Sequence, residues 1–159
     1  LTRIPEAITI SDKRVGLHLP DMFNFSASFV ISQRFKDLID EHEPDVHQLV
    51  PVTVELDTPD PRQEQYYSLW VMPVLEAATD KLGGIEPAAE GYPEWGMVEA
   101  APRGPNDLAV LKEVIGNRCI WRDRQLYTRK REFFSDQFFE HMKRVGIDGW
   151  EIDAIWQEI

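Results

Sequence analysis

The sequence predicts a single α+β domain over residues 1–159, with a mixed or antiparallel sheet and two amphipathic helices. The first observation is a pattern of two apolar residues followed by Ser-x-x-Phe, which occurs at Val30–Phe35 and again at Phe133–Phe138. The second is that each copy leads into an amphipathic helical run. The third is that an alternating apolar stretch follows each run, over 47–56 and over 150–156. The chain therefore contains two loosely repeated strand–helix–strand units, in which only the Ser and the Phe are identical.

The first unit is expected to begin with a strand over 27–31 and to continue into a helix. Ser32 suits the N-cap of this helix, because its hydroxyl can accept a hydrogen bond from a free amide in the first turn. Pro44 ends the helix, since proline lacks the backbone donor and clashes with the preceding turn. The apolar side chains at helical spacing are Phe35, Leu38 and Ile39.

The middle of the chain is expected to hold two strands and a long loop. Apolar residues alternate over 47–56, which indicates a half-buried strand, and Pro51 on its other face suggests a sheet edge or a bulge. Residues 66–75 are aromatic and β-branched on both faces, which favours one strand covered on both sides. Residues 80–107 are rich in glycine and proline, so we expect an irregular loop, with a short helix near Ala88.

Three short strands are expected next, at Leu108–Ile115, Arg118–Trp121 and Leu126–Phe134. Turns at 116–117 and 122–123 would separate them. The second helix then begins after the N-cap Ser135 and ends at Gly146, a residue favoured just beyond a helix. The chain closes with the alternating strand over 150–156.

The charge is strongly acidic, with a formal net charge of −11. Residues 37–107 hold 16 carboxylates and 3 cationic side chains, a local net charge of −13, whereas residues 108–144 are net basic. Phosphates would be repelled, so direct nucleic-acid binding is disfavoured, while a basic protein partner would be attracted. The same charge is also compatible with a role in solubility alone.

Several classes of protein are excluded or disfavoured by what the sequence lacks. No apolar run is long enough to span a membrane, and the N-terminal residues show neither a charged leader nor an apolar segment, so we expect no membrane partner. The use of a single cysteine suits a cytoplasmic location. Cys119 is the single cysteine, which excludes an intrachain disulfide and a cysteine-based metal cluster. Its position in an apolar run predicts a buried side chain.

No constellation in the sequence predicts catalysis, a cofactor or a metal. His42 and His47 are five residues apart with Pro44 between them, whereas a zinc protease helix needs two histidines four apart. The serines lie at helix caps or in strands, and no glycine-rich phosphate loop is present. We therefore expect a protein that is not an enzyme. The alternatives are a small hydrolase that uses carboxylates and His47, or a structural subunit of a larger assembly.

The acidic end of the first helix is the first candidate binding surface. Carboxylates at a helix C-terminus oppose the helix dipole, so such a cluster can be kept for a partner at some cost in stability. A solvated charged helix end is the simpler interpretation. The candidate contact residues here are Asp40, Glu41, Glu43 and Asp45.

The long loop is the second candidate binding surface. It brings aromatic side chains together with acids, a combination that suits an interface anchor with a charged rim. Alternatively, Trp95 folds back to cover the core beneath the loop. The candidate contact residues here are Glu90, Tyr92, Glu94 and Trp95.

Helix caps and strand alternations at five places carry a resemblance to a known family. These segments are 29–35, 46–52, 120–122, 134–138 and 145–150. In them the chain resembles the bacterial polymorphic-toxin immunity proteins of the immunity protein 11 type, a DUF1629-like group.

The resemblance implies a non-enzymatic protein that binds and silences a toxin delivered by a neighbouring cell. It brings no set of catalytic residues and does not define the toxin. From electrostatics alone, a nuclease is the natural target of an acidic inhibitor, because nucleases are basic where they grip phosphates.

Overall fold

The computed structural model describes most of the chain. The described residues are 7–10, 19–25, 28–56, 65–87, 97–99, 108–126, 132–151 and 155–159. The chain divides into two compact units, Leu1–Trp70 with His141–Trp150, and Val71–Glu140 with Glu151–Ile159. We call these unit 1 and unit 2. Each unit therefore takes segments from distant parts of the sequence.

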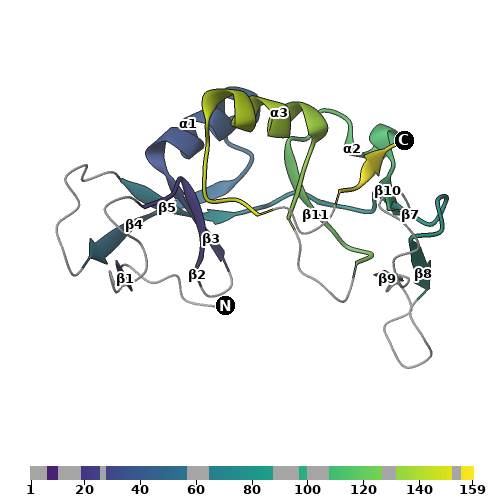
Figure 1. The fold of residues 1–159 in the computed structure, drawn as a ribbon, viewed down its shortest axis with the longest axis horizontal. Helices are drawn as coiled ribbons and strands as arrows, with labels where there is room; N and C mark the ends of the chain where they lie inside the picture. The colour runs from purple at the N-terminus through teal and green to yellow at the C-terminus, as the bar shows by residue number, and fades with distance from the viewer. Residues whose placement is uncertain are drawn as a thin grey trace. The chain divides into compact units, whose positions relative to one another are not determined.

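Unit 1 is built on a five-stranded sheet with the order β1-β4-β5-β3-β2 (Figure 1). Its strands are β1 (Ala7–Ile10), β2 (Met22–Phe25), β3 (Ser28–Ser32), β4 (Gln48–Leu56) and β5 (Tyr66–Trp70). The strand β1 runs parallel to β4, and the other neighbours are antiparallel. Because β1 pairs only with residues 53–56 of β4, Pro51 lies where β5 is the one described neighbour. The missing donor of proline is tolerated at such a local edge.

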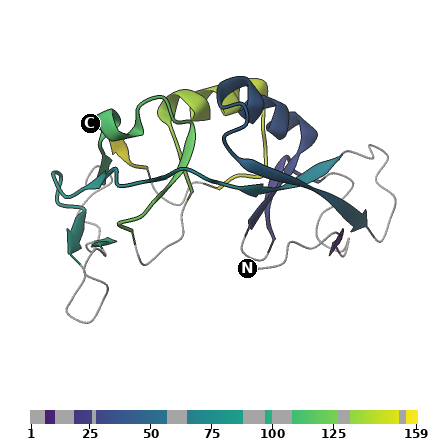
Figure 2. The ribbon, with the colours of Figure 1, turned by 180° about the vertical axis from the view of Figure 1, so that it is seen from behind.

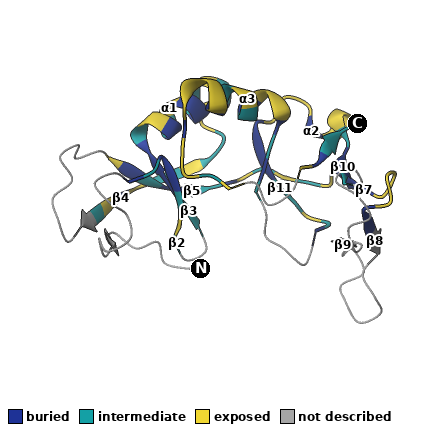
Figure 3. Ribbon diagram, viewed as in Figure 1, coloured by how far each residue is buried: buried dark blue, intermediate teal, exposed yellow. Residues whose placement is uncertain are grey.

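Helix α1 (Gln33–His42) follows β3 directly and packs along β3 and β5. Figure 1 and the reverse view in Figure 2 show it over one face of these strands, and Figure 3 shows its division into buried and exposed faces. Phe35, Leu38 and Ile39 form the buried face, as their spacing predicts. A second cluster of apolar side chains in this unit gathers around Leu19, Val30, Val52 and Tyr66.

Asp21 joins the start of α1 to the segment after α3. Its side chain is buried, accepts a hydrogen bond from the Ser32 hydroxyl at 2.6 Å, and accepts one from the Asp148 amide at 3.2 Å. The Asp21 amide in turn donates to the Asp148 carboxylate at 2.7 Å. Arg34 forms an ion pair with Asp21 at 3.4 Å. This exchange of hydrogen bonds fixes residues 147–149 beside β2.

Ser32→Ala is expected to destabilise the protein by about 2 kcal/mol, at the upper end of the range for N-cap removal. The Ser32 hydroxyl accepts from the Phe35 amide at 3.1 Å and also donates to the buried Asp21. Its loss would leave both groups short of a partner. Ser135→Ala is the matched control, because Ser135 caps α3 through a longer bond of 3.4 Å to the Phe138 amide. Urea unfolding should show the smaller cost for Ser135→Ala, and equal costs would contradict the role given to Asp21.

Unit 2 contains short strands in three small sheets, with the orders β13-β10-β7, β12-β11-β6 and β8-β9. The strands are β6 (Val74–Leu75), β7 (Ala78–Thr79), β8 (Ile85–Pro87), β9 (Met97–Glu99), β10 (Ala109–Val110), β11 (Ile120–Asp123), β12 (Glu132–Phe134) and β13 (Gln157–Glu158). A four-residue helix, α2 (Lys112–Ile115), follows β10.

The core of unit 2 is centred on three aromatic rings. Trp121 stacks on Phe133 with the ring centroids 5.5 Å apart, and Trp156 meets Phe133 edge-on at 5.3 Å. The Asp123 carboxylate anchors the backbone of residues 77–78 beside this core, since it accepts hydrogen bonds from the amides of Ala77 and Ala78 at 2.8 Å each. Burial raises the pKa of Asp123 above its usual value, while these hydrogen bonds act in the opposite direction.

Helix α3 (Asp136–Val145) begins after the N-cap Ser135 and ends at Gly146, which has a positive φ of 72°. The Phe138 amide donates to Ser135 as the Phe35 amide donates to Ser32. The two copies of the Ser-x-x-Phe pattern therefore have the same physical meaning, an N-cap with an aromatic residue at its third helical position. Phe138 and Met142 are buried, whereas Val145 is exposed.

The α+β class, both long helices, the strand over 47–56 and the buried Cys119 are confirmed. The single strand expected over 66–75 is wrong, because it breaks at residues 71–73 into β5 and β6. Pro73 in this break cannot donate to a ladder. The break also lies where the chain passes from unit 1 to unit 2.

Other boundaries in unit 2 also differ from expectation. The strand expected over 108–115 ends at Val110, and α2 follows it, because Leu111 and Ile115 are one helical turn apart. Residues 122–123 belong to β11 instead of a turn. The loop expected over 80–107 contains the paired strands β8 and β9, and Ala88 lies outside the described residues.

The strand expected at the end of the chain also differs from the structure. Of residues 150–156, those that the structure describes are not in a strand, and β13 begins one residue later. The described part of the chain contains no helix that could cross a bilayer, since its longest helices have 10 residues.

Candidate functional site

The end of α1 carries the first set of predicted contact residues, and the structure separates them by exposure. Asp40 and Glu41 lie in the last turn of the helix, where Asp40 is partly exposed and Glu41 is exposed. Asp45 lies in the turn that follows and is exposed, with a positive φ of 61°. Asp tolerates this left-handed conformation better than most residues. These three carboxylates can reach a partner.

Asp40 is also part of a network that runs along α1 to the sheet. Lys36, one turn earlier, forms an ion pair with it, and the Lys36 ammonium lies 5.6 Å from the centre of the Tyr67 ring. The hydrogen bond to Asp40 raises the pKa of Lys36. The Tyr67 hydroxyl donates to Gln33 at 2.5 Å. Asp40 is therefore oriented by its neighbours, although its charge is partly neutralised by Lys36.

Glu43, unlike the other predicted contact residues of this helix end, is buried, which disfavours direct contact with a partner. It is the C-cap of α1, its residue is 4% exposed, and its carboxylate lies 2.9 Å from Nε2 of His47. The proline turn at 44–46 brings His47 back over the helix end. The hydrolase hypothesis places His47 at a site open to substrate, whereas its side chain is 0% exposed. Glu43 and His47 thus close the end of the helix.

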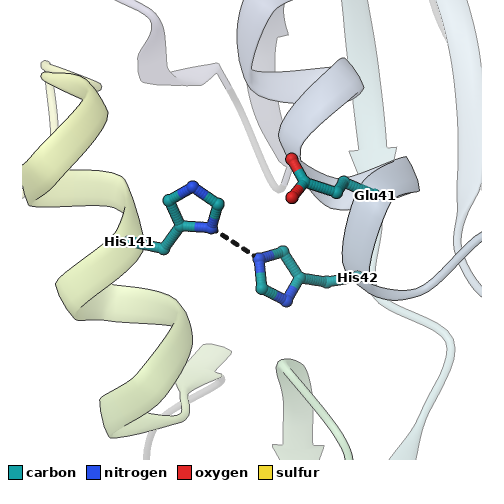
Figure 4. A group of neighbouring side chains, drawn as sticks. All are labelled: Glu41, His42 and His141. Carbon is teal, nitrogen blue, oxygen red and sulfur yellow. Dashed lines mark hydrogen bonds between the residues drawn. The ribbon is translucent and has the colours of Figure 1, made fainter.

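A group that the sequence did not predict lies beside these acids. Nε2 of His42, the last residue of α1, is 2.7 Å from Nδ1 of His141 on α3, and the rings meet edge-on. Figure 4 shows the two imidazoles facing each other, with the Glu41 carboxylate next to the His42 ring. Suitable ligand atoms of all three residues lie within 4.8 Å of one another. Spacing gave no signal for this group, because His42 and His141 are 99 positions apart.

The second set of predicted contact residues lies outside the part of the chain that the structure describes. These residues are Glu90, Tyr92, Glu94 and Trp95. Their role remains a prediction from the sequence. The serines at 32 and 135 act as helix caps, as expected.

Comparison with known proteins identifies a family. The model of the immunity protein family Imm11 matches residues 1–156. Among curated proteins, none matches this chain. The family match covers nearly the whole sequence, including every residue of the acidic helix end.

Proposed function

The chain belongs to the immunity protein family Imm11, and from this premise we propose that it neutralises a cognate bacterial toxin by direct protein–protein contact. The observation that supports this mechanism is the acidic end of α1, where Asp40, Glu41 and Asp45 reach the surface. Together with the negative charge of residues 37–107, this face would attract a basic polypeptide. The proposed function needs no chemical step by the immunity protein itself.

We propose a toxin with a basic surface as the partner. A nuclease is the class that fits best, since an enzyme that grips phosphates concentrates lysine and arginine at its active site. An acidic inhibitor can cover such a site and compete with the nucleic acid for the same charges. The protein would act in the cytoplasm, where a delivered nuclease meets its substrate.

Reversing the exposed acids of α1 should slow association with the toxin. The variant Asp40→Lys, Glu41→Lys, Asp45→Lys leaves the buried Glu43 intact and changes the charge of the proposed face by six units. We expect the association rate constant at low salt to fall by about tenfold or more, because charge on an interface acts mainly on the encounter rate. Stopped-flow mixing with the cognate toxin domain would measure it.

The control must carry the same change in net charge elsewhere. Glu113, Asp136 and Glu151 are exposed and lie outside residues 37–107, and their triple replacement by lysine provides this control. The control should slow association less than the α1 variant does. If both variants slow it equally, the effect belongs to the net charge, and the end of α1 is not the contact surface.

Trp95 is the proposed aromatic anchor of the second contact surface. Trp95→Ala should weaken toxin binding by at least about 2 kcal/mol, as truncation of a buried interface tryptophan does. Calorimetric titration of the toxin domain would measure the loss, with the melting temperature of the free variant as a check on folding. A loss within about 0.5 kcal/mol would remove Trp95 from the interface.

A further inference from the structure

We propose that Glu41, His42 and His141 form a binding site for a divalent transition-metal ion of the Zn²⁺ class. The proposal stands on the geometry of these side chains and is independent of toxin binding. All three residues belong to unit 1. His42 and Glu41 are neighbours at the end of α1, and His141 approaches them from α3 (Figure 4).

The donor set determines the class of ion. Two imidazole nitrogens and one carboxylate oxygen suit Zn²⁺ and Co²⁺, whereas Mg²⁺ and Ca²⁺ prefer oxygen ligands alone. Two histidines and one glutamate, with a fourth position left for water, is an arrangement that zinc accepts. The partial exposure of His42 and His141 and the full exposure of Glu41 give an ion access to the site.

The distances require little rearrangement. The facing nitrogens of His42 and His141 are 2.7 Å apart. Two nitrogens bound to one tetrahedral zinc, each at about 2.0–2.1 Å from the ion, are about 3.3 Å apart. The rings would therefore separate by about half an ångström. A Glu41 carboxylate oxygen lies within 4.8 Å of one ring nitrogen of each histidine, and side-chain rotation can bring it closer.

The hydrogen bond between the rings also constrains how an ion enters. One ring must donate an N–H and the other must accept it, so one facing nitrogen carries a proton. An ion needs a lone pair on both nitrogens, and the donating ring must therefore move its proton to its other nitrogen. This change of tautomer replaces one hydrogen bond by two metal–nitrogen bonds.

The other histidine near the end of α1 does not compete for this ion. Nε2 of His47 is occupied by Glu43, and the side chain is buried. The site thus depends on two of the four histidines in the chain, which makes its test specific.

The test is a calorimetric titration of Zn²⁺ into metal-free protein from which any polyhistidine tag has been removed. We expect one ion per chain, and no binding of Mg²⁺ under the same conditions. His42→Gln and His141→Gln should each weaken Zn²⁺ binding by at least about 100-fold, since loss of an outer partner alone costs 10–100-fold. Glu41→Gln should weaken it by about tenfold. Glu113→Gln, at an exposed carboxylate on another helix, is the matched control and should leave the affinity unchanged.

A second measurement uses the unaltered chain, so that a variant that fails to fold cannot leave the result open. Long-range ¹H–¹⁵N spectra of the imidazoles should show that Zn²⁺ shifts the signals of two of the four rings, His42 and His141. Co²⁺ should give the visible absorption of a tetrahedral site. Shifts at other histidines, unchanged affinity in His42→Gln, or loss of binding in Glu113→Gln would each overturn the proposal.

Discussion

Gly149→Ala is expected to destabilise the protein by about 4 kcal/mol or more. A Cβ atom at this position would lie 2.1 Å from the backbone oxygen of Met22 and 2.5 Å from Cβ of Pro20. Neither neighbour can rotate away, because one is backbone and the other belongs to a rigid ring. The positive φ of 85° adds the strain that an L side chain has in this conformation. Overpacking and backbone strain each cost about 1–3 kcal/mol, and here they add.

The stability would be lost through the contacts between β2 and the segment around Asp148. The Met22 amide donates to the Asp148 carbonyl at 3.1 Å, and Asp21 exchanges hydrogen bonds with Asp148. Alanine at 149 would push this segment away from β2. Gly83→Ala is the matched control, since Gly83 has a φ of 78° but nothing within 4 Å of the added methyl group. It should cost only about 1–2 kcal/mol. Urea unfolding compares the two, and similar losses would show that the close approach to Met22 is absent.

Glu43→Ala is expected to have the second largest effect, a loss of about 3 kcal/mol. The Glu43 carboxylate is the partner of His47 Nε2 at 2.9 Å, and both side chains are buried. Nδ1 of His47 is buried without a partner among the described residues. Removing the carboxylate would leave a buried imidazole with neither nitrogen paired there, and a cavity at the end of α1.

Glu41→Ala is the control, because Glu41 belongs to the same helix end but is exposed. Its replacement should change the free energy of unfolding by no more than about 0.5 kcal/mol. Glu43→Gln should recover part of the loss, since its amide oxygen can still accept a hydrogen bond. Equal effects of Glu43→Ala and Glu41→Ala would mean that Glu43 is solvated, as the sequence suggested.

The features that the sequence predicted well are those set by neighbouring residues. The cap at Ser32 and the cap at Ser135 each depend on an amide three positions later, and the buried face of α1 follows from helical spacing. The strand over 66–75 was predicted as one element because its composition favours strand throughout, whereas its break depends on the division of the chain into two units.

The site shows the same limit. The exposure of Asp40, Glu41 and Asp45 follows from their place at a helix end. The burial of Glu43 does not follow from its place in the helix, because it requires the turn at Pro44 to return His47 to the helix end. The meeting of His42 with His141 depends on tertiary structure alone. Nothing in the sequence around Gly149 indicates that glycine is required there. The requirement arises because the backbone oxygen of Met22 occupies the space that a side chain would need.

The central claim is that this protein disarms its partner by holding it through a negatively charged face. The most direct test mixes the purified chain with its cognate toxin domain, and follows both complex formation and toxin activity as salt is raised. We predict a complex that silences the toxin, weakens with salt, and returns both polypeptides with unchanged masses. A toxin that stays active with no complex at low salt, or one that is inactivated by cleavage or covalent change, would contradict the claim.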